Sequence, residues 1–178
     1  LLIEECDQTL IDTKSPQELE LRIVLPNGQI RWLQNKIIPF FEKGKLVRLK
    51  GVNIDISEKK ATEQSLNILN QAVEQSQASV LILDADGQIE YVNPNFTRVT
   101  GYSQEEVIGE TPFILRTEKH SDEFYEHMLN TIRAGKIWKG EILTKKKNGE
   151  VLWENVIITP IQQKSGNISH YVVLQEDI

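Results

Sequence analysis

The sequence is poor in cysteine and lacks any long hydrophobic run. Its 178 residues contain a single cysteine, Cys6, which excludes an internal disulfide framework and a metal site built from several cysteines. No apolar stretch approaches the roughly 20 residues of a membrane span, and the first residues show no signal-peptide pattern. We expect a cytoplasmic globular protein and no membrane contact by this chain.

Positive charge and catalytic motifs are also scarce. Lysine and arginine number 20 against 26 acidic residues, a formal net charge of −6, which argues against binding to a phosphate backbone. The sequence has no His-Glu-x-x-His, no glycine-rich phosphate loop, no Gly-x-Ser-x-Gly elbow and no paired cysteine and histidine. We therefore expect no nucleic-acid partner, no catalytic residue and no metal site, and we do not expect this chain to be an enzyme.

An internal repeat is present instead. At a constant offset of 121 residues, a turn dipeptide, a tryptophan and a proline occur twice: Asn27-Gly28, Trp32 and Pro39, then Asn148-Gly149, Trp153 and Pro160. The first residue aligns near residue 122, so about residues 80–121 have no counterpart in the first copy. We interpret the start at Leu1, without methionine, as a cut within a domain. The missing half is absent, disordered or supplied by another chain.

The hydrophobic pattern of one unit predicts an antiparallel α+β fold. Alternating apolar residues around an Asp-Gly turn predict a hairpin, and helical spacing predicts a helix from Asp122 to Ala134. Ser103 and Glu106 form a capping box that starts a short helix. The proline of Asn93-Pro94-Asn95 ends the hairpin. The expected strands cover residues 80–83, 88–92, 137–145, 151–160 and 168–176.

A single helix is predicted between the two copies, from residue 57 to about 75. Ser57 is placed to act as its N-cap. Leu66, Leu69 and Val73 form a narrow apolar seam, and the remaining face is polar. Only about two heptads fit, whereas a convincing coiled coil needs three or four. The helix is therefore either an ordinary surface helix or a dimerising one.

These residues resemble the PAS family. The resemblance rests on motifs of the second copy: Glu90-Tyr91-Val92-Asn93-Pro94, Thr100-Gly101-Tyr102, Glu106-Val107-Ile108-Gly109, Trp138-Lys139-Gly140-Glu141 and Glu176-Asp177-Ile178. It implies a five-stranded antiparallel sheet with short flanking helices that cradles a small-molecule pocket. The expected domains are residues 1–56, the C-terminal part of a first PAS domain; 57–75, a linker helix; and 76–178, a complete second PAS domain.

Strand parity, combined with the resemblance, indicates which side chains face this pocket. Successive side chains along a strand alternate between two faces. We expect a hypothetical binding pocket formed by Thr144, Glu154, Gln175, Val156, Ile158 and Phe96. In an apolar pocket the charge of Glu154 needs a partner or is neutralised. This side chain either contacts a small polar ligand or water, together with Thr144 and Gln175, or reaches solvent at the strand end.

The same parity leaves Trp153 and Ile157 on the outer face of the sheet. An apolar outer face needs a cover, which is either the linker helix of the same chain or a second protomer. The resemblance to dimeric sensors makes a homodimer the expected partner. It would form through the helices or the outer sheet face, by way of Trp153, Ile157, Leu66, Leu69 and Val73.

The resemblance suggests two candidate cofactors, flavin and haem, although we expect first of all that the chain binds no cofactor. Blue-light-sensing relatives use a cysteine where this sequence has Pro112, which excludes adduct photochemistry. They hold the flavin with two asparagines and a glutamine. The corresponding residues here are Thr144, Glu154 and Gln175, so only the glutamine is retained. His120 lies where haem-binding oxygen sensors carry their ligand. The arginine of those sensors corresponds to Gly140, so a solvated loop histidine is the preferred interpretation.

Taken together, the resemblance implies a sensory input module of a multidomain signalling protein, first of all a sensor histidine kinase of a two-component system. It would sense a small ligand or mediate dimerisation and pass the signal through the linker helix to a downstream output domain. Strand ends at Asp55 and Asp177 would lead the signal into following helices. The alternatives are a flavin-binding redox sensor and a ligand-free scaffold of a diguanylate cyclase.

Overall fold

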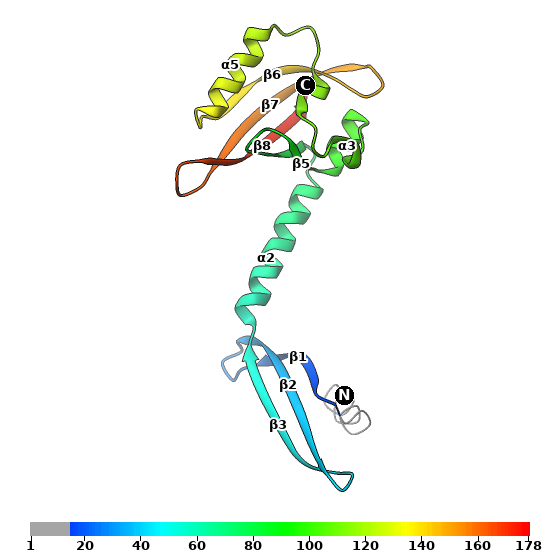
Figure 1. The fold of residues 1–178 in the computed structure, drawn as a ribbon, viewed down its shortest axis with the longest axis vertical. Coiled ribbons are helices and arrows are strands. Elements are labelled where there is room, and N and C mark those ends of the chain that lie inside the picture. Colours follow the sequence, from blue (N-terminus) through cyan, green and yellow to red (C-terminus); the bar gives the residue numbers. More distant parts are fainter. Residues whose placement is uncertain (1–14) are drawn as a thin grey trace. The chain divides into compact units, whose positions relative to one another are not determined.

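The chain divides into two compact units, residues 1–68 and 69–178. The computed structural model describes residues 15–178 (Figure 1). The start of the expected first domain, with Cys6, lies outside the described residues. The boundary between the units falls inside the helix that the sequence predicted as a linker. Among the described residues, no helix is both long and apolar enough to cross a membrane.

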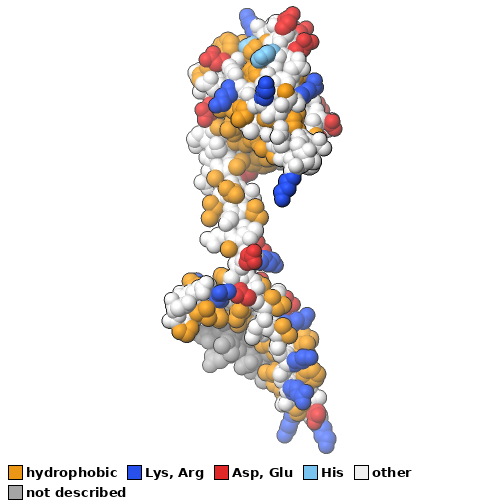
Figure 2. Space-filling model, turned by 90° about the vertical axis from the view of Figure 1, so that its left-hand side faces the viewer, with side chains coloured by type: hydrophobic (Ala, Val, Ile, Leu, Met, Phe, Trp, Pro, Cys, Tyr) orange, Lys and Arg blue, Asp and Glu red, His pale blue; other side chains and the backbone are white. Residues whose placement is uncertain are grey.

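The first unit contains a three-stranded antiparallel sheet in the order β1–β2–β3. Its strands are β1 (Gln17–Val24), β2 (Ile30–Glu42) and β3 (Lys45–Asp55). Many of its apolar side chains are exposed, and Figure 2 shows such side chains beside Lys and Arg on the surface of this unit. The exposed set includes Phe40, Leu46, Val47, Leu49, Val52 and Ile54.

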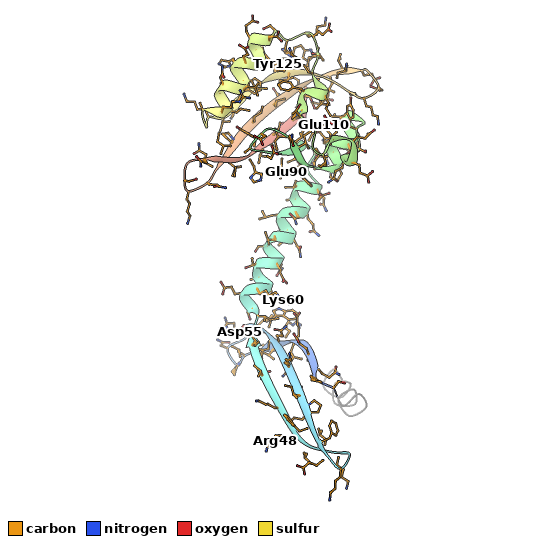
Figure 3. All side chains as sticks on the ribbon, viewed as in Figure 1. Arg48, Asp55, Lys60, Glu90, Glu110 and Tyr125 are labelled. Atoms are coloured by element: carbon orange, nitrogen blue, oxygen red, sulfur yellow. The ribbon has the colours of Figure 1, made fainter. Side chains whose placement is uncertain are left out.

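Helix α2 (Ser57–Glu74) starts directly after β3 and buries none of its residues. The sequence predicted that Ser57 caps this helix, but Ser57 is its first residue. Asp55 Oδ1 accepts a hydrogen bond from the Ser57 backbone N at 2.9 Å, and Ser57 Oγ accepts one from the Trp32 backbone N at 2.9 Å. The capping acceptor is Asp55, because β3 ends there and leaves its carboxylate free to turn toward the first helical N–H. Figure 3 shows Asp55 and Lys60 at this end of α2.

Removal of the Asp55 carboxylate should fray the first turn of α2. Hydrogen bonds from Ser57, and then from Arg31, lower the pKa of Asp55 to about 2. A carboxylate with a lowered pKa stabilises the folded state above its ordinary pKa, and this contribution is lost as the pH falls through the folded value. We expect Asp55→Ala to reduce the helical circular dichroism signal at pH 7, and this difference to vanish near pH 2.

Asp55→Asn is the matched control, because its amide oxygen can still accept the hydrogen bond from Ser57. It should retain most of the helical signal at neutral pH. Equal signals from the wild type and Asp55→Ala at pH 7 would show that Asp55 does not cap the helix.

The second unit contains a five-stranded antiparallel sheet in the order β5–β4–β8–β7–β6. The strands are β4 (Ser79–Asp84), β5 (Ile89–Val92), β6 (Trp138–Lys145), β7 (Val151–Gln162) and β8 (Ile168–Asp177). Between β5 and β6 lie α3 (Pro94–Thr100), α4 (Gln104–Val107), the 3₁₀ helix η1 (Pro112–Leu115) and α5 (Asp122–Arg133). The predicted α+β class and the five-stranded antiparallel sheet are confirmed.

Local chemistry fixes where the short helices begin. The Asn93 side chain accepts a hydrogen bond from the Phe96 backbone N and caps α3, and Pro94 occupies the first helical position, where no N–H is needed. The same proline that ends the hairpin therefore starts a helix. The predicted capping box of Ser103 and Glu106 is present at α4. These signals hold the segment between β5 and β6 on one face of the sheet.

The core of the second unit lies between this segment and the sheet. Leu81, Phe96 and Val107 are completely shielded from solvent. Packing at the edge strand is tight, because a Cβ added to Gly140 would come within 2.6 Å of the Trp138 ring. Trp138 can fold over the neighbouring backbone only because residue 140 has no side chain.

The two units share the geometry of their last three strands. Equivalent residues are paired in both: Gln17 with Ile37 and Leu33 with Asp55 in the first, Trp138 with Ile158 and Glu154 with Asp177 in the second. After the last strand, the Ile56 backbone N donates to the Trp32 carbonyl at 2.9 Å, and the Ile178 backbone N donates to the Trp153 carbonyl at 3.2 Å. Among the described residues of the first unit, β4 and β5 have no counterpart.

Candidate functional site

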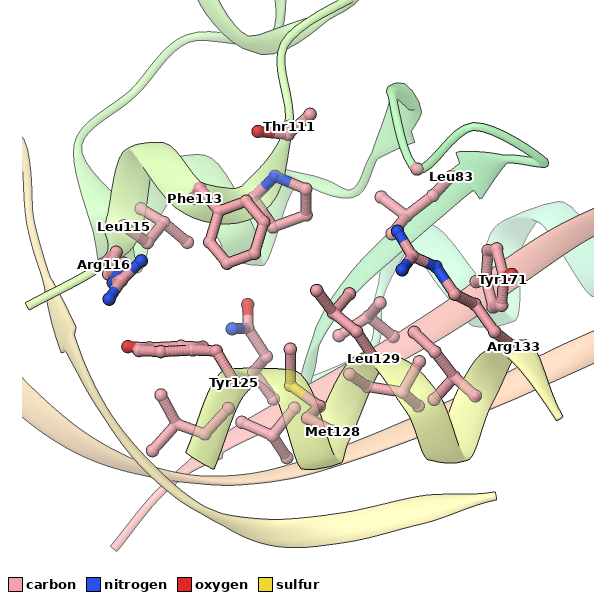
Figure 4. Close-up of a pocket in the computed structure, with 18 of the residues that line it drawn as sticks. Leu83, Thr111, Phe113, Leu115, Arg116, Tyr125, Met128, Leu129, Arg133 and Tyr171 are labelled. Atoms are coloured by element: carbon pink, nitrogen blue, oxygen red, sulfur yellow. The ribbon is translucent and has the colours of Figure 1, made fainter. Parts of the chain in front are cut away.

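A cavity of about 340 Å³ lies in the second unit between η1, α5 and the inner face of the sheet (Figure 4). This volume is at the lower end of the range for small-molecule sites, roughly 300–1,000 Å³. Its wall is mainly aliphatic and aromatic. The side chains of this wall include Leu83, Phe113, Leu115, Met128, Leu129, Ile132, Ile142, Val156, Ile158, Tyr171 and Val173.

The two sides of the cavity follow from the periodicities of the elements that form it. On α5, Tyr125, Met128, Leu129 and Ile132 recur at the spacing of one helix face, and all four line the cavity. On the sheet, alternate residues of β6, β7 and β8 face the same space. In Figure 4, Met128 and Leu129 lie between Arg116 with Tyr125 on one side and Arg133 on the other.

One polar atom of the cavity wall, the amide oxygen of Gln175, is buried and has no hydrogen-bond partner, and Gln175 is only 6% exposed. Tyr125 is equally buried. Burial raises the pKa of Tyr125, whereas the nearby Arg116 charge and a hydrogen bond with the Thr117 backbone oppose the rise. The hydroxyl therefore stays protonated at neutral pH. Unpaired buried polar groups are rare in native proteins, so this wall presents unused hydrogen-bonding capacity.

Two arginines also line the cavity. Arg116 forms an ion pair with Asp122, and its guanidinium lies 4.4 Å from the centre of the Tyr125 ring. Arg133, near the end of α5, forms no ion pair within 4.0 Å among the described residues. Asp86, in the β4–β5 turn, is the acidic residue of the wall. With Arg116 paired to Asp122, Arg133 and Asp86 are the remaining charged side chains of the described wall.

The structure places the sequence-predicted pocket residues in three positions. Thr144, Gln175, Val156 and Ile158 line the cavity. Glu154 is 1% exposed and accepts a hydrogen bond from Thr144 Oγ1 at 2.7 Å, so it lies behind the wall and does not reach solvent at the strand end. Phe96 is buried in the core and does not line the cavity.

Glu154 is a buried carboxyl in an unfavourable environment. Burial raises its pKa, the hydrogen bond from Thr144 opposes the rise, and the nearby Asp177 charge adds to it. Because the folded state binds this proton more tightly than the unfolded state, the carboxyl stabilises the fold at low pH. This contribution is lost as the pH rises through the raised folded pKa.

We expect Glu154→Gln to raise the free energy of unfolding at pH 7 by about 1 kcal/mol, a few degrees in Tm, since it removes a buried charge and keeps an acceptor for Thr144. The gain should shrink when the melting curves are repeated at pH 4. Thr144→Val, which removes the donor, should lower Tm at pH 7. A Glu154→Gln protein that is less stable at both pH values would contradict this account.

The sequence analysis missed the α5 side of the site and both arginines. The apolar residues whose helical spacing predicts the helix from Asp122 to Ala134 are Phe124, Met128, Leu129 and Ile132, whereas the cavity uses Tyr125 in place of Phe124. If tyrosine is counted as apolar, the spacing of Tyr125 from Met128, Leu129 and Ile132 predicts the helix face that lines the cavity. No local signal distinguishes Arg116 or Arg133 from ordinary surface arginines, because their roles depend on how η1 and α5 pack on the sheet.

The environment of His120 does not suit a haem ligand. Its Nε2 accepts a hydrogen bond from the Leu143 backbone N at 2.8 Å, and its ring stacks on Phe124 with centroids 4.4 Å apart. The His120 ring also packs edge-on against the Trp153 ring, with centroids 5.7 Å apart. The nitrogen that would bind iron is thus engaged with the sheet edge, and His120 does not line the cavity. Within the described part of the chain, no cluster of acidic, histidine or cysteine side chains could hold a metal.

Flavin fits the cavity poorly. Recognition of the flavin ring requires several paired amide donors and acceptors. Of the three positions that the resemblance indicates, Thr144 and Glu154 are engaged with each other, and Gln175 is the one amide side chain on the described cavity wall.

A second polar cluster ties the last turn of α2 to the sheet. Asn93 Nδ2 donates to the carbonyls of Val73, at 3.1 Å, and Ala78, at 3.0 Å. The Tyr91 hydroxyl donates to Glu74 at 2.5 Å. Burial, and then this hydrogen bond, raises the pKa of Tyr91 to about 12, which keeps it protonated at physiological pH. The end of the helix is therefore coupled to β5 and to the start of α3.

Comparisons with known proteins agree with this architecture. The family model described as the PAS fold matches residues 67–178. The chain is 30% identical over 117 residues to a nitrogen fixation regulatory protein of Klebsiella oxytoca, covering 66% of this chain and 24% of that protein. It is 29% identical over 121 residues to a blue-light-activated histidine kinase of Brucella canis, covering 66% and 25%. The chain thus spans about a quarter of these curated relatives.

Solved structures show the same fold. The LOV domain of the Erythrobacter litoralis EL346 blue-light-activated histidine kinase aligns with a TM-score of 0.55 and 25% identity, over 58% of this chain and 98% of that one. An RNA-binding Light-Oxygen-Voltage receptor aligns with a TM-score of 0.59 and 13% identity, over 98% of this chain and 81% of that one. The second likeness concerns the fold alone.

A five-stranded antiparallel sheet with short helices and a cavity on one face is the architecture of PAS domains, which are sensory modules. The chain belongs to the PAS family, as its sequence motifs predicted.

Proposed function

We propose that this chain is the sensory input region of a larger signalling protein and that its second unit binds a small molecule in the cavity. The observation that carries the proposal is the Gln175 amide oxygen, which is buried in an aliphatic wall without a partner. A bound molecule would satisfy it. Asn93 and Tyr91 connect the same unit to α2, which gives ligand binding a route to the helix.

The parent protein that we propose is a sensor histidine kinase. The support is that the Brucella relative and the Erythrobacter protein are both blue-light-activated histidine kinases. Because the chain covers a quarter or less of its curated relatives, the output domain would lie elsewhere in the parent chain. A diguanylate cyclase is the alternative parent.

The test combines an absorbance spectrum of the purified chain with thermal shifts against a metabolite panel. A ligand at 100 times its Kd stabilises the fold by about 2.7 kcal/mol, which is several degrees in Tm. We expect a spectrum without cofactor bands and a response to a subset of ligands. Flavin bands would replace this proposal with the redox-sensor alternative. A featureless spectrum with no response would favour the ligand-free scaffold.

We further propose that residues 1–56 belong to the C-terminal part of another PAS unit and residues 76–178 to a complete one, joined by the helix 57–75. The support is the shared strand register and the shared hydrogen bond after the last strand. The test is a chimaera in which residues 138–178 replace the equivalent residues 17–56. It should retain the helical signal of α2, and loss of that signal would contradict the equivalence.

We also propose a homodimer. On α2, Leu66 is 55% and Leu69 is 63% exposed, and on the outer sheet face Trp153 is 46% exposed, which leaves apolar surface for a second protomer. Leu69→Asp should shift the sedimentation profile toward the monomer, whereas Gln71→Asp on the same helix should not. Trp153→Asp tests the sheet face, and an unchanged profile for both Leu69→Asp and Trp153→Asp would contradict the dimer.

A further inference from the structure

We propose that the ligand of the cavity is a small apolar acid, a molecule with an apolar body, one hydrogen-bond donor that meets Gln175 and one anionic group that meets Arg133. This inference rests on the proposed function, because it assumes that the cavity binds a ligand. It names the chemical class of that ligand from the three kinds of surface that the wall presents.

The first surface is the apolar wall, which determines the body of the ligand. Aliphatic side chains approach from the sheet, and Met128 and Leu129 approach from α5. Transfer of apolar groups from water to such a wall is favourable, by roughly 25 cal/mol per Å² buried. A sugar or a highly charged nucleotide would leave most of its polar groups unpaired against this wall. An aromatic ring or a short alkyl chain matches it.

The second surface is the unpaired amide oxygen of Gln175. It projects from β8 beside Val156 of β7, in the middle of the sheet, and it is an acceptor without a donor. Thr144, the other polar residue of the predicted pocket that lines the cavity, donates its hydrogen bond to Glu154. A ligand O–H or N–H would therefore satisfy Gln175. Tyr125, whose hydroxyl interacts with the Thr117 backbone, also lines the same cavity.

The third surface is the guanidinium of Arg133. The Asp122 carboxylate already neutralises Arg116. Arg133, which lies on the opposite side of Met128 and Leu129 in Figure 4, has no such ion pair among the described residues. A guanidinium with unused donors binds carboxylates well. Asp86 also faces the cavity, and its charge opposes an anion, so the attraction to Arg133 has to exceed that repulsion.

Three matched probes separate these contributions by isothermal titration with the whole chain. They are para-hydroxyphenylpropionate, with donor and anion; phenylpropionate, with the anion alone; and para-hydroxyphenylpropionamide, with the donor alone. We expect the first to bind about tenfold more tightly than either of the others, because each loses one charged or neutral hydrogen-bonded contact. Equal affinity of the acid and its amide would overturn the assignment of an anion.

Variants connect each contribution to its residue. Arg133→Gln should weaken binding of the two acids about tenfold and leave the amide unchanged. Gln175→Leu should weaken binding of the hydroxylated probes and leave phenylpropionate unchanged. Asp86→Asn should strengthen binding of the acids a fewfold. Lys136→Gln is the control, because this nearby cation does not line the cavity, and it should change none of the affinities.

The outcomes distinguish this inference from the proposed function. Weaker acid binding by Asp86→Asn would overturn the inference, because Asp86 would then support the bound acid instead of repelling it. A thermal response to neutral panel ligands, without a response to any acid, would overturn the inference and leave the sensory function standing. No response to any ligand would overturn both.

Discussion

Replacing Asn93 with alanine is expected to lower the free energy of unfolding of the second unit by about 3 kcal/mol. The side chain is completely buried. Its oxygen accepts hydrogen bonds from the Val80 and Phe96 backbone nitrogens, at 3.0 and 3.1 Å, and its nitrogen donates to the Val73 and Ala78 carbonyls. Each net bond contributes about 0.5–1.5 kcal/mol, and the buried partners left behind add a desolvation cost.

Urea denaturation measures this loss, and hydrogen exchange locates it. We expect faster exchange in the last turn of α2 and in the first turn of α3, because both lose a partner. Asn130→Ala is the control, since this exposed asparagine lies on α5; it should change stability by less than about 0.5 kcal/mol. A loss of similar size in both variants would show that Asn93 has no special role.

Replacing Phe96 with alanine is expected to have the largest effect on stability, a loss of about 3–5 kcal/mol. Phe96 has no exposed surface, and it packs in the core with Leu81, Ile89 and Val107. Deletion of the ring leaves a void that the surrounding elements fill only in part. Chemical denaturation of Phe96→Ala measures the loss.

Phe113→Ala is the matched control, because Phe113 lines the cavity and is 42% exposed. It should cost less than about 1.5 kcal/mol and should weaken binding of whichever ligand the thermal shift assay identifies. If Phe96→Ala changed ligand affinity without a loss of stability, Phe96 would be part of the binding wall after all.

The fold could be predicted from the sequence because its signals are local. Turn residues, alternating strands and the Ser103 capping box each lie within a few positions of the element that they determine. The repeat then predicted that the two copies share one strand pattern. The Ser57 cap was wrong for a similar local reason: serine and aspartate are both good caps, and only the exact end of β3 selects Asp55.

The site was predictable only in part. Strand parity identified the inner face of β6, β7 and β8, where Thr144, Gln175, Val156 and Ile158 line the cavity. Parity does not tell how deep a cavity reaches along a strand, and Glu154 lies just behind the wall. Phe96 lies on α3, to which strand parity does not apply, and it fills the core. The residues that approach from η1 and α5 depend on tertiary packing, which no sequence period encodes.

The common register of the two sheets has a consequence for protein engineering. The difference in length between the copies lies in the turn before the last strand, away from the ladder. In both copies the backbone therefore leaves the sheet at an equivalent position, where Ile56 forms a backbone hydrogen bond with Trp32 and Ile178 forms one with Trp153. The ends of the two sheets should therefore be interchangeable. If residues 57–74 are fused after Ile178, we expect them to form a helix that leaves the second sheet in the same orientation in which α2 leaves the first.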